Sequence, residues 1–268
     1  MPPPEVHVQD RAGTTVELLV ARSLCELGRV RHGFTTRRGG VSRGPFESLN
    51  LALRPGEDPL AVVENWERAA GALLPGARAA DLALADQVHG AAVLRVSRPS
   101  GPLHTLGAAD ALVTTRPGTI LAVRGGDCLP VLLAAPGGVA AAHAGWRGVA
   151  LGVVPAALQA LLVASGASPG EVRVAIGPHA TGARFETGPD VPAALLRAGV
   201  PAAAFLTGER GGKALVDLAG AVEAQLRAAG VRHVERVAGC TLDEPARFFS
   251  HRREGQRTGR QAGLIALA

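Results

Sequence analysis

Residues 119–148 read TILAVRGGDCLPVLLAAPGGVAAAHAGWRG and carry the strongest indication of the fold. Three apolar, strand-like runs lie within this stretch, at residues 119–124, 129–135 and 138–142. The next residues, 148–165, read as a helix, which we expect to kink at Pro155 because proline removes a backbone hydrogen bond. The stretch therefore predicts three closely spaced strands followed by a helix.

Strands and helices are also mixed on both sides of this stretch. Further strand-like runs cover residues 16–20, 30–36, 82–96, 111–115, 171–177, 231–238 and 259–267. Helical runs cover residues 58–74, 190–198 and 214–229, and Asp58 before Pro59 suits the start of the first. Because the elements do not alternate regularly, we expect a mixed α/β fold, with one mixed sheet or two packed sheets flanked by helices, rather than a Rossmann fold.

Length and composition indicate a globular protein. The chain has 268 residues, of which 47% are hydrophobic and 19% charged, enough for a sizeable core. We find no repeat or linker and expect a single domain over residues 1–268, with about the first ten residues flexible. The net charge is +5, but no basic stretch is interleaved with aromatic residues, so we expect no nucleic-acid partner.

The cysteines and apolar segments bear on the compartment. The three cysteines, Cys25, Cys128 and Cys240, form no close pair, which argues against a disulfide framework and suits a reducing cytoplasm. The proline-rich N-terminus does not resemble a signal peptide. The apolar run 149–166 contains Pro155, so we expect a buried helix there and no membrane partner. We expect a cytoplasmic protein.

Two histidines and one cysteine stand where apolar runs break. His89 lies in ALADQVHG, Cys128 in RGGDC and His143 at the start of HAGWRG, 39 and 15 residues apart along the chain. Zinc takes imidazole nitrogen and thiolate ligands, and a catalytic zinc keeps one position open. The same residues also fit a metal-free nucleophile pair, with Cys128 attacking and His143 or His89 acting as base. A third interpretation is structural: a hydrogen-bonded histidine and a buried cysteine are common in any fold.

Several motifs occur in one order along the chain and are specific together. They are FTTRRGGVSRGPFESLNLAL, DQVHG, DALVTTRPG, VRGGDCLPVLL, AAHAGWRG, AIGP and CTLDEPARFFSHRREGQRTGRQAGLI. The chain resembles the YfiH family, also called the multicopper polyphenol oxidase or laccase-domain family, from about residue 30 to residue 268. This family includes bacterial purine nucleoside phosphorylases and the enzymatic domain of human FAMIN.

The resemblance implies a fold, a metal and an activity. The fold is a single α/β domain of two packed sheets between helices, in α-β-β-α layers. The metal is one zinc ion bound by His89, Cys128 and His143, with copper possible in some relatives. The activity is phosphorolysis of adenosine, inosine and methylthioadenosine with inorganic phosphate, releasing base and ribose 1-phosphate, together with deamination of adenosine. The implied partners are a small-molecule nucleoside and phosphate, and the oligomeric state, monomer or dimer, stays open.

Other functions remain as alternatives. Relatives imply peptidoglycan editing, in which a UDP-muramoyl-serine precursor is cleaved, and the residues alone also fit a metal-free cysteine hydrolase. A structural zinc would need a fourth protein ligand, for which His179 and Cys240 are the candidates. We disfavour a polyphenol oxidase, because three ligands around one ion are not a multicopper centre.

Arginines are the expected phosphate ligands, because the guanidinium fork matches phosphate geometry. We name Arg38, in the glycine-rich loop, and Arg147, four residues after His143, as substrate-binding candidates, with Arg252 and Arg253 as substitutes. The sequence departs from the family at His251, where FFSHRREG replaces an FYSYRRDG-like motif, and this leaves the substrate preference open.

Overall fold

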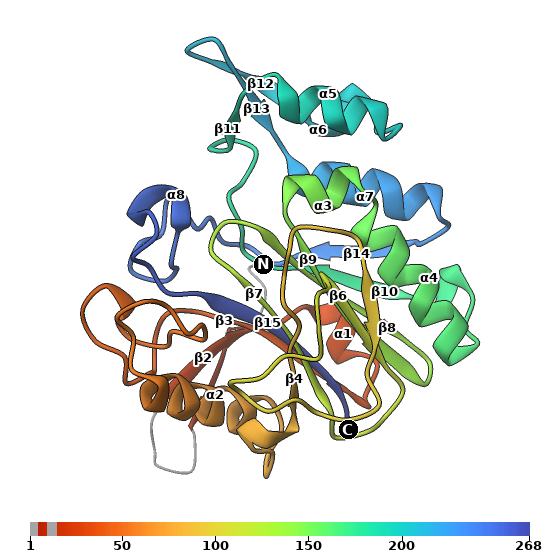
Figure 1. The fold of residues 1–268 in the computed structure, drawn as a ribbon. Coiled ribbons are helices and arrows are strands. Elements are labelled where there is room, and N and C mark those ends of the chain that lie inside the picture. Colours follow the sequence, from red (N-terminus) through yellow and green to blue (C-terminus); the bar gives the residue numbers. More distant parts are fainter. Residues whose placement is uncertain (1–4, 10–14) are drawn as a thin grey trace.

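The computed structural model describes residues 5–9 and 15–268, and its central feature is a pair of six-stranded sheets (Figure 1). The first sheet has the order β1 (Glu5–Gln9), β2 (Thr15–Leu19), β3 (Val30–Thr35), β15 (Gln261–Leu267), β7 (Ile120–Gly125) and β4 (Leu82–Ala83). The second has the order β14 (His233–Arg236), β10 (Arg173–Ile176), β8 (Leu129–Ala135), β9 (Gly138–Ala144), β6 (Ala111–Thr114) and β5 (Val93–Arg95).

Eight α-helices accompany these sheets in the described residues. They are α1 (Arg22–Cys25), α2 (Pro59–Leu73), α3 (Trp146–Ala150), α4 (Val153–Ser165), α5 (Asp190–Arg197), α6 (Ala202–Phe205), α7 (Leu218–Ala228) and α8 (His251–Glu254). Asp58 caps α2 as expected, since its carboxylate accepts the backbone N–H of Leu60. None of the helices in residues 5–9 and 15–268 combines the length and the apolar character needed to span a membrane.

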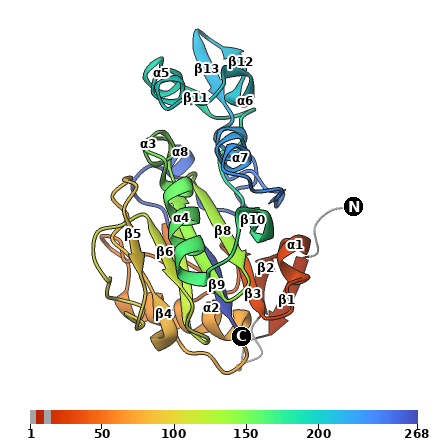
Figure 2. The same cartoon turned by 90° about the vertical axis from the view of Figure 1, so that its right-hand side faces the viewer.

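The period-two alternation of side chains builds three core layers. In β15, Ile265 points into the core between the two sheets, while Leu264 points to the outer face, against α2. In β8, Leu132 likewise faces the first sheet, and Leu133 faces α4. Figure 2 shows α4 lying across the second sheet. The predicted α-β-β-α layering is therefore confirmed.

A third, small sheet was not predicted. It consists of β11 (Glu186–Thr187), β13 (Lys213–Val216) and β12 (Leu206–Arg210), and with α5 and α6 it stands above α3 and α7 in Figure 1. The expected helix 214–229 was wrong at its start, because Lys213–Val216 pairs with strands on both sides. The helix begins only after Asp217, whose carboxylate accepts the N–H of Ala219.

The helix expected at 148–165 is also divided differently. Two helices, α3 and α4, meet at Gly152, which takes the left-handed conformation with φ of 79°. Pro155 lies in the first turn of α4, where a missing N–H costs no helical hydrogen bond. The break therefore occurs at the glycine, and the expected kink at Pro155 was wrong. Of the residues expected to be flexible, 1–4 and 10 lie outside the described part, and Glu5–Gln9 pair with β2.

Candidate metal site and its cavity

Three separate segments bring His89, Cys128 and His143 together. His89 lies between β4 and β5, Cys128 in the turn between β7 and β8, and His143 near the end of β9. Their ligand atoms all lie within 4.8 Å of one another. The Cys128 Sγ is 3.9 Å from Nε2 of His89, and the two imidazole centroids are 4.9 Å apart. The structure thus assembles the three predicted residues into one cluster.

The buried carboxylate of Asp110, just before β6, orients both histidines. It accepts backbone N–H groups from Val88 at 3.1 Å, His89 at 3.0 Å and Gly90 at 2.7 Å. The same carboxylate lies 2.9 Å from Nδ1 of His143, which therefore carries the hydrogen and leaves Nε2 as the free ligand atom. The sequence analysis quoted DALVTTRPG but did not single out Asp110.

Lack of space beside the cluster explains why residue 145, two residues after His143, is a glycine. A Cβ on Gly145 would lie 2.8 Å from Cδ2 of His89 and 3.1 Å from Sγ of Cys128. Any side chain at this position would therefore push the cluster apart. His89 and Asp127 themselves have positive φ angles of 61° and 107°, which non-glycine residues rarely adopt.

Electrostatics polarise the cluster. Burial raises the pKa of the Cys128 thiol, but the charge of His143 and hydrogen bonds from both imidazoles outweigh this and lower it to about 6. Burial lowers the pKa of His143, but the Cys128 thiolate and the Asp110 carboxylate outweigh it and raise it to about 9. Without a metal, the chain therefore favours a thiolate beside an imidazolium.

The donor set fits one zinc ion. Two imidazole nitrogens and one thiolate are zinc ligands, and three protein ligands leave a coordination position open. The low pKa of Cys128 supplies the thiolate that a metal requires. Copper also accepts this donor set.

The two candidates for a fourth ligand lie elsewhere. His179 places Nδ1 2.8 Å from the carbonyl oxygen of Gly177, and its backbone pairs with that of Cys240. The thiol of Cys240 accepts the Thr181 hydroxyl at 3.4 Å. Among the residues that the structure describes, the cluster contains only His89, Cys128 and His143. This is the ligand number of a catalytic rather than a structural zinc site.

A cavity of about 460 Å³ opens over the cluster. Its wall consists of Ala52, Leu53, Arg54, Asp86, Gln87, His89, Arg124, Gly125, Gly126, Cys128, His143, His251 and Arg260. The wall is basic, because Arg54, Arg124 and Arg260 all reach it. Sequence analysis missed these three arginines, which come from distant segments and share no motif.

In the described residues none of the three arginines forms an ion pair, although the charge of Asp86 acts on Arg124 and that of Asp127 acts on Arg260. Their guanidinium groups donate hydrogen bonds to backbone carbonyls, such as those from Arg54 to Gln256 and from Arg124 to Ala85. Nε of Arg54 is buried without any hydrogen-bond partner. Burial and the charge of Arg54 lower the pKa of both other guanidinium groups. An anionic ligand would relieve this repulsion.

The two arginines named from the sequence lie outside the cavity wall. Arg38 donates to the carbonyl of Ala246 at 3.1 Å and lies 3.6 Å from the Glu17 carboxylate. The guanidinium of Arg147 is 4.4 Å from the Trp146 ring centroid. Both side chains are therefore engaged with other protein groups.

Arg252 and Arg253, the substitute phosphate-binding candidates, and Asp127 stabilise the C-terminal segment. Arg252 stacks 4.4 Å over Phe185, and Arg253 donates to the carbonyl oxygens of Thr241 and Phe248. The Asp127 carboxylate accepts the Thr241 hydroxyl and the backbone N–H of Arg252, both at 2.7 Å. Asp127 thus anchors the turn that carries Cys128 to the segment of residues 241–252.

Comparison with known proteins agrees with this architecture. The family described as multi-copper polyphenol oxidoreductase laccase matches residues 31–268. The chain belongs to this laccase-domain family. The resemblance to the YfiH family is confirmed, because the chain is also similar to a hypothetical protein YfiH of Bacillus licheniformis, with a TM-score of 0.86 and 32% identity. That match covers 94% of this chain and 96% of the other.

Two curated relatives are more similar to this chain in sequence. A purine nucleoside phosphorylase of Deinococcus radiodurans is 41% identical over 240 residues, covering 89% of each chain. Purine nucleoside phosphorylase ORF3 of Streptomyces griseus is 43% identical over 242 residues, covering 90% of this chain and 95% of the relative.

Proposed function

We propose that this laccase-domain protein is a zinc-dependent purine nucleoside phosphorylase, a transferase that cleaves nucleosides with inorganic phosphate. The observation that carries the proposal is the group of three arginines, which form no ion pair in the described residues, beside the His89, Cys128 and His143 cluster. Relatives about 40% identical bear the name purine nucleoside phosphorylase, which supports the same activity.

The cavity supplies complementary surfaces for the two substrates. Arg54, Arg124 and Arg260 hold the phosphate, because guanidinium groups bind its oxygens with paired hydrogen bonds. Ala52 and Leu53 give the wall an apolar part against which the purine lies. A phosphate oxygen then attacks C1′ of the ribose as the bond to the purine breaks, giving base and ribose 1-phosphate.

The metal ligands are His89, Cys128 and His143. Bound there, zinc supplies Lewis-acid polarisation. Asp110 holds His143 in the tautomer that leaves Nε2 for the metal, and Gly145 leaves room for the cluster. The family name refers to a multicopper oxidase, but three ligand residues suit one ion, so we propose no polyphenol oxidation.

We propose that deamination of adenosine uses the same cavity, since three protein ligands leave a metal position open. Two further functions compete. The basic wall would also accept the diphosphate of a UDP-muramoyl-serine precursor, and the low pKa of Cys128 would suit a metal-free cysteine hydrolase. The absence of a disulfide among Cys25, Cys128 and Cys240 supports a cytoplasmic setting.

A product assay tests these proposals. Purified protein of known zinc content is given inosine or adenosine, with and without phosphate, and the products are separated by chromatography. We expect base and ribose 1-phosphate only with phosphate, and loss of both in His143→Ala. Inosine formed from adenosine without phosphate would support deamination.

Two outcomes would contradict the phosphorylase proposal. Turnover that survives complete removal of metal by a chelator would point to a cysteine hydrolase. Absence of nucleoside turnover in protein with about one zinc per chain would favour the peptidoglycan precursor or a structural metal.

A further inference from the structure

His251 is the one histidine of the cavity wall outside the metal cluster, among the residues that line it. It is the first residue of α8, and its side chain is exposed in the cavity that also contains Arg260 and Cys128. Neither phosphate binding nor metal binding, as proposed above, uses this imidazole.

The hydrogen bond that Nδ1 of His251 makes determines whether Nε2 can donate or accept a hydrogen bond. Nδ1 of His251 lies 2.9 Å from the carbonyl oxygen of Gly255. Since a carbonyl oxygen only accepts, Nδ1 must carry the hydrogen, and in the neutral ring Nε2 is then an acceptor. The structure shows no protein donor for Nε2 among the described residues.

Main-chain hydrogen bonds hold the His251 ring beside the turn that carries Cys128. The backbone N–H of His251 donates to the carbonyl of Gly126 at 3.3 Å, and the next N–H, of Arg252, donates to Asp127. Ser250 caps the short helix by accepting the N–H of Arg253. His251 is therefore positioned by the same turn that carries Cys128.

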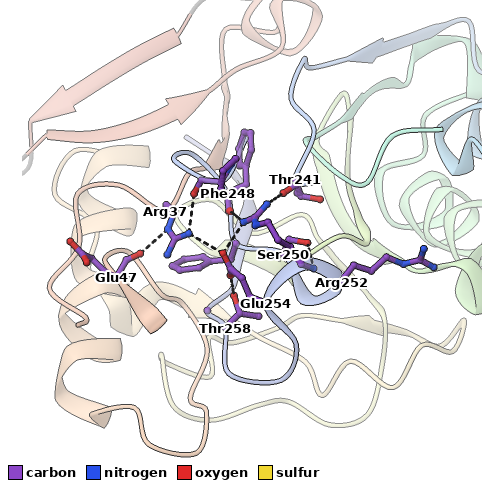
Figure 3. A network of polar contacts seen from close by, with 12 residues as sticks. Arg37, Glu47, Thr241, Phe248, Ser250, Arg252, Glu254 and Thr258 are labelled. Atoms are coloured by element: carbon purple, nitrogen blue, oxygen red, sulfur yellow. Dashed lines mark hydrogen bonds and ion pairs between the residues drawn. The ribbon is translucent and has the colours of Figure 1, made fainter. Parts of the chain in front are cut away.

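A partly buried polar network secures the segment from the other side. In Figure 3 Arg37, from the N-terminal loop, reaches the Glu254 carboxylate at 3.2 Å and the carbonyl of Glu47 at 2.8 Å. Glu254 also accepts the hydroxyl of Thr258 and the guanidinium of Arg253. Burial raises the pKa of Glu254, but these donors outweigh it and lower the pKa, so the carboxylate stays charged and the network intact.

The acceptor on His251 complements a cavity whose charged groups are mainly donors. The guanidinium groups of Arg54, Arg124 and Arg260 can only donate hydrogen bonds. Of the other acceptors, the Gln87 amide oxygen accepts the N–H of Arg124 at 2.8 Å, and the charge of the Asp86 carboxylate acts on the same arginine. Nε2 of His251 is thus free to accept from a ligand.

We propose that His251 is a specificity-determining residue whose Nε2 accepts a hydrogen bond from a ribose hydroxyl of the nucleoside. This inference rests on the proposed phosphorylase function, which supplies the ribose. A site built to pair with a hydroxyl discriminates against the analogue that lacks it, because the acceptor is then left unpaired.

Deoxynucleosides test the pairing. kcat/KM is measured with phosphate for inosine and its 2′-, 3′- and 5′-deoxy analogues, in the wild type, His251→Phe and His251→Gln. We expect one analogue to be slower than inosine by about tenfold in the wild type, and this ratio to fall to about one in His251→Phe. The amide oxygen of His251→Gln should restore part of the preference.

The ratio of kcat/KM between inosine and each deoxy analogue distinguishes a direct contact of His251 with the ribose from a general structural effect of the substitution. A general loss of folding or of the Gly255 hydrogen bond would slow all four substrates equally and leave the ratios unchanged. His233→Phe, at an exposed histidine on β14, is the matched control and should behave as the wild type. Unchanged ratios in His251→Phe would overturn the inference alone. Absence of inosine phosphorolysis in the wild type would overturn the proposed function, and this inference with it.

Discussion

The carboxylate of Asp110 lies 2.9 Å from Nδ1 of His143 and also accepts the backbone N–H of His89. One buried side chain therefore fixes two of the three proposed metal ligands, which stand 54 residues apart in the sequence (143 − 89). A carboxylate in this position orients the metal-binding imidazole, and replacing it typically costs about 10–100-fold in metal affinity or activity.

Asp110→Asn should weaken zinc binding by about 10–100-fold, because an amide can present N–H to Nδ1 and so favour the wrong tautomer. Competition with a chromophoric chelator measures the affinity. Asp243→Asn, at a half-exposed surface ion pair with Arg184, is the control and should bind zinc normally. Equal affinities in the two variants would show that Asp110 does not orient the ligands.

Much of the fold could be predicted from the sequence, because burial follows local patterns. The runs around β7, β8 and β9 are continuous and apolar, as strands buried on both faces require. The small third sheet was missed since β11 has only two residues, and the pairing of β13 on both sides overrides a helical composition.

The site was predictable only where residues stand in motifs. His89, Cys128 and His143 lie in short, specific motifs, and all three converge in the structure. Arg124 and Arg260 become neighbours because Ala262 on β15 pairs with Arg124 on β7, a contact across more than a hundred residues. No local pattern encodes such a pairing. Arg124 and Arg260 lie within quoted motifs but were not singled out, whereas Arg38 and Arg147, which were, lie outside the cavity wall.

The arginines of the cavity should control the KM for phosphate. Arg124→Gln and Arg260→Gln are each expected to raise it by about 10–100-fold, since each removes a charge-assisted hydrogen bond. Arg147→Gln should leave it within about twofold, because this side chain stacks on Trp146 instead. Steady-state kinetics at saturating inosine give the values. A raised KM for phosphate in Arg147→Gln alone would indicate that phosphate binds at Arg147, as predicted from the sequence.

Gly145→Ala should disrupt the metal cluster without unfolding the chain. The added Cβ would stand 2.8 Å from the His89 ring, so the imidazole must move away from Cys128. We expect zinc content per chain to fall well below that of the wild type, measured by atomic emission. The control is Gly71→Ala in α2, where a Cβ meets nothing within 4 Å and alanine should stabilise the helix by about 0.5–1 kcal/mol. Full zinc occupancy in Gly145→Ala would mean that the cluster has more room than the structure gives it.

His32 lies on β3 and is not part of the cavity wall. This histidine should make the stability of the folded chain depend on pH. Its Nε2 accepts the backbone N–H of Ala21 at 2.8 Å, and burial lowers its pKa to about 4, against the opposing charge of Glu235. The unfolded chain, with an ordinary pKa of 6.5, therefore binds more protons than the folded chain between pH 4 and 6.5.

This difference fixes the sign of the effect. The contribution of neutral His32 to stability is complete above pH 6.5 and is lost as pH falls. At pH 4 the loss amounts to about 3 kcal/mol of unfolding free energy. Urea unfolding at pH 7.5 and 4.5 measures the change, and carboxylates contribute to it in every variant. His32→Gln should therefore show a smaller drop in unfolding free energy than the wild type, whereas His233→Gln should show the same drop. Equal drops in all three proteins would mean that His32 is protonated as easily in the folded chain as in the unfolded one.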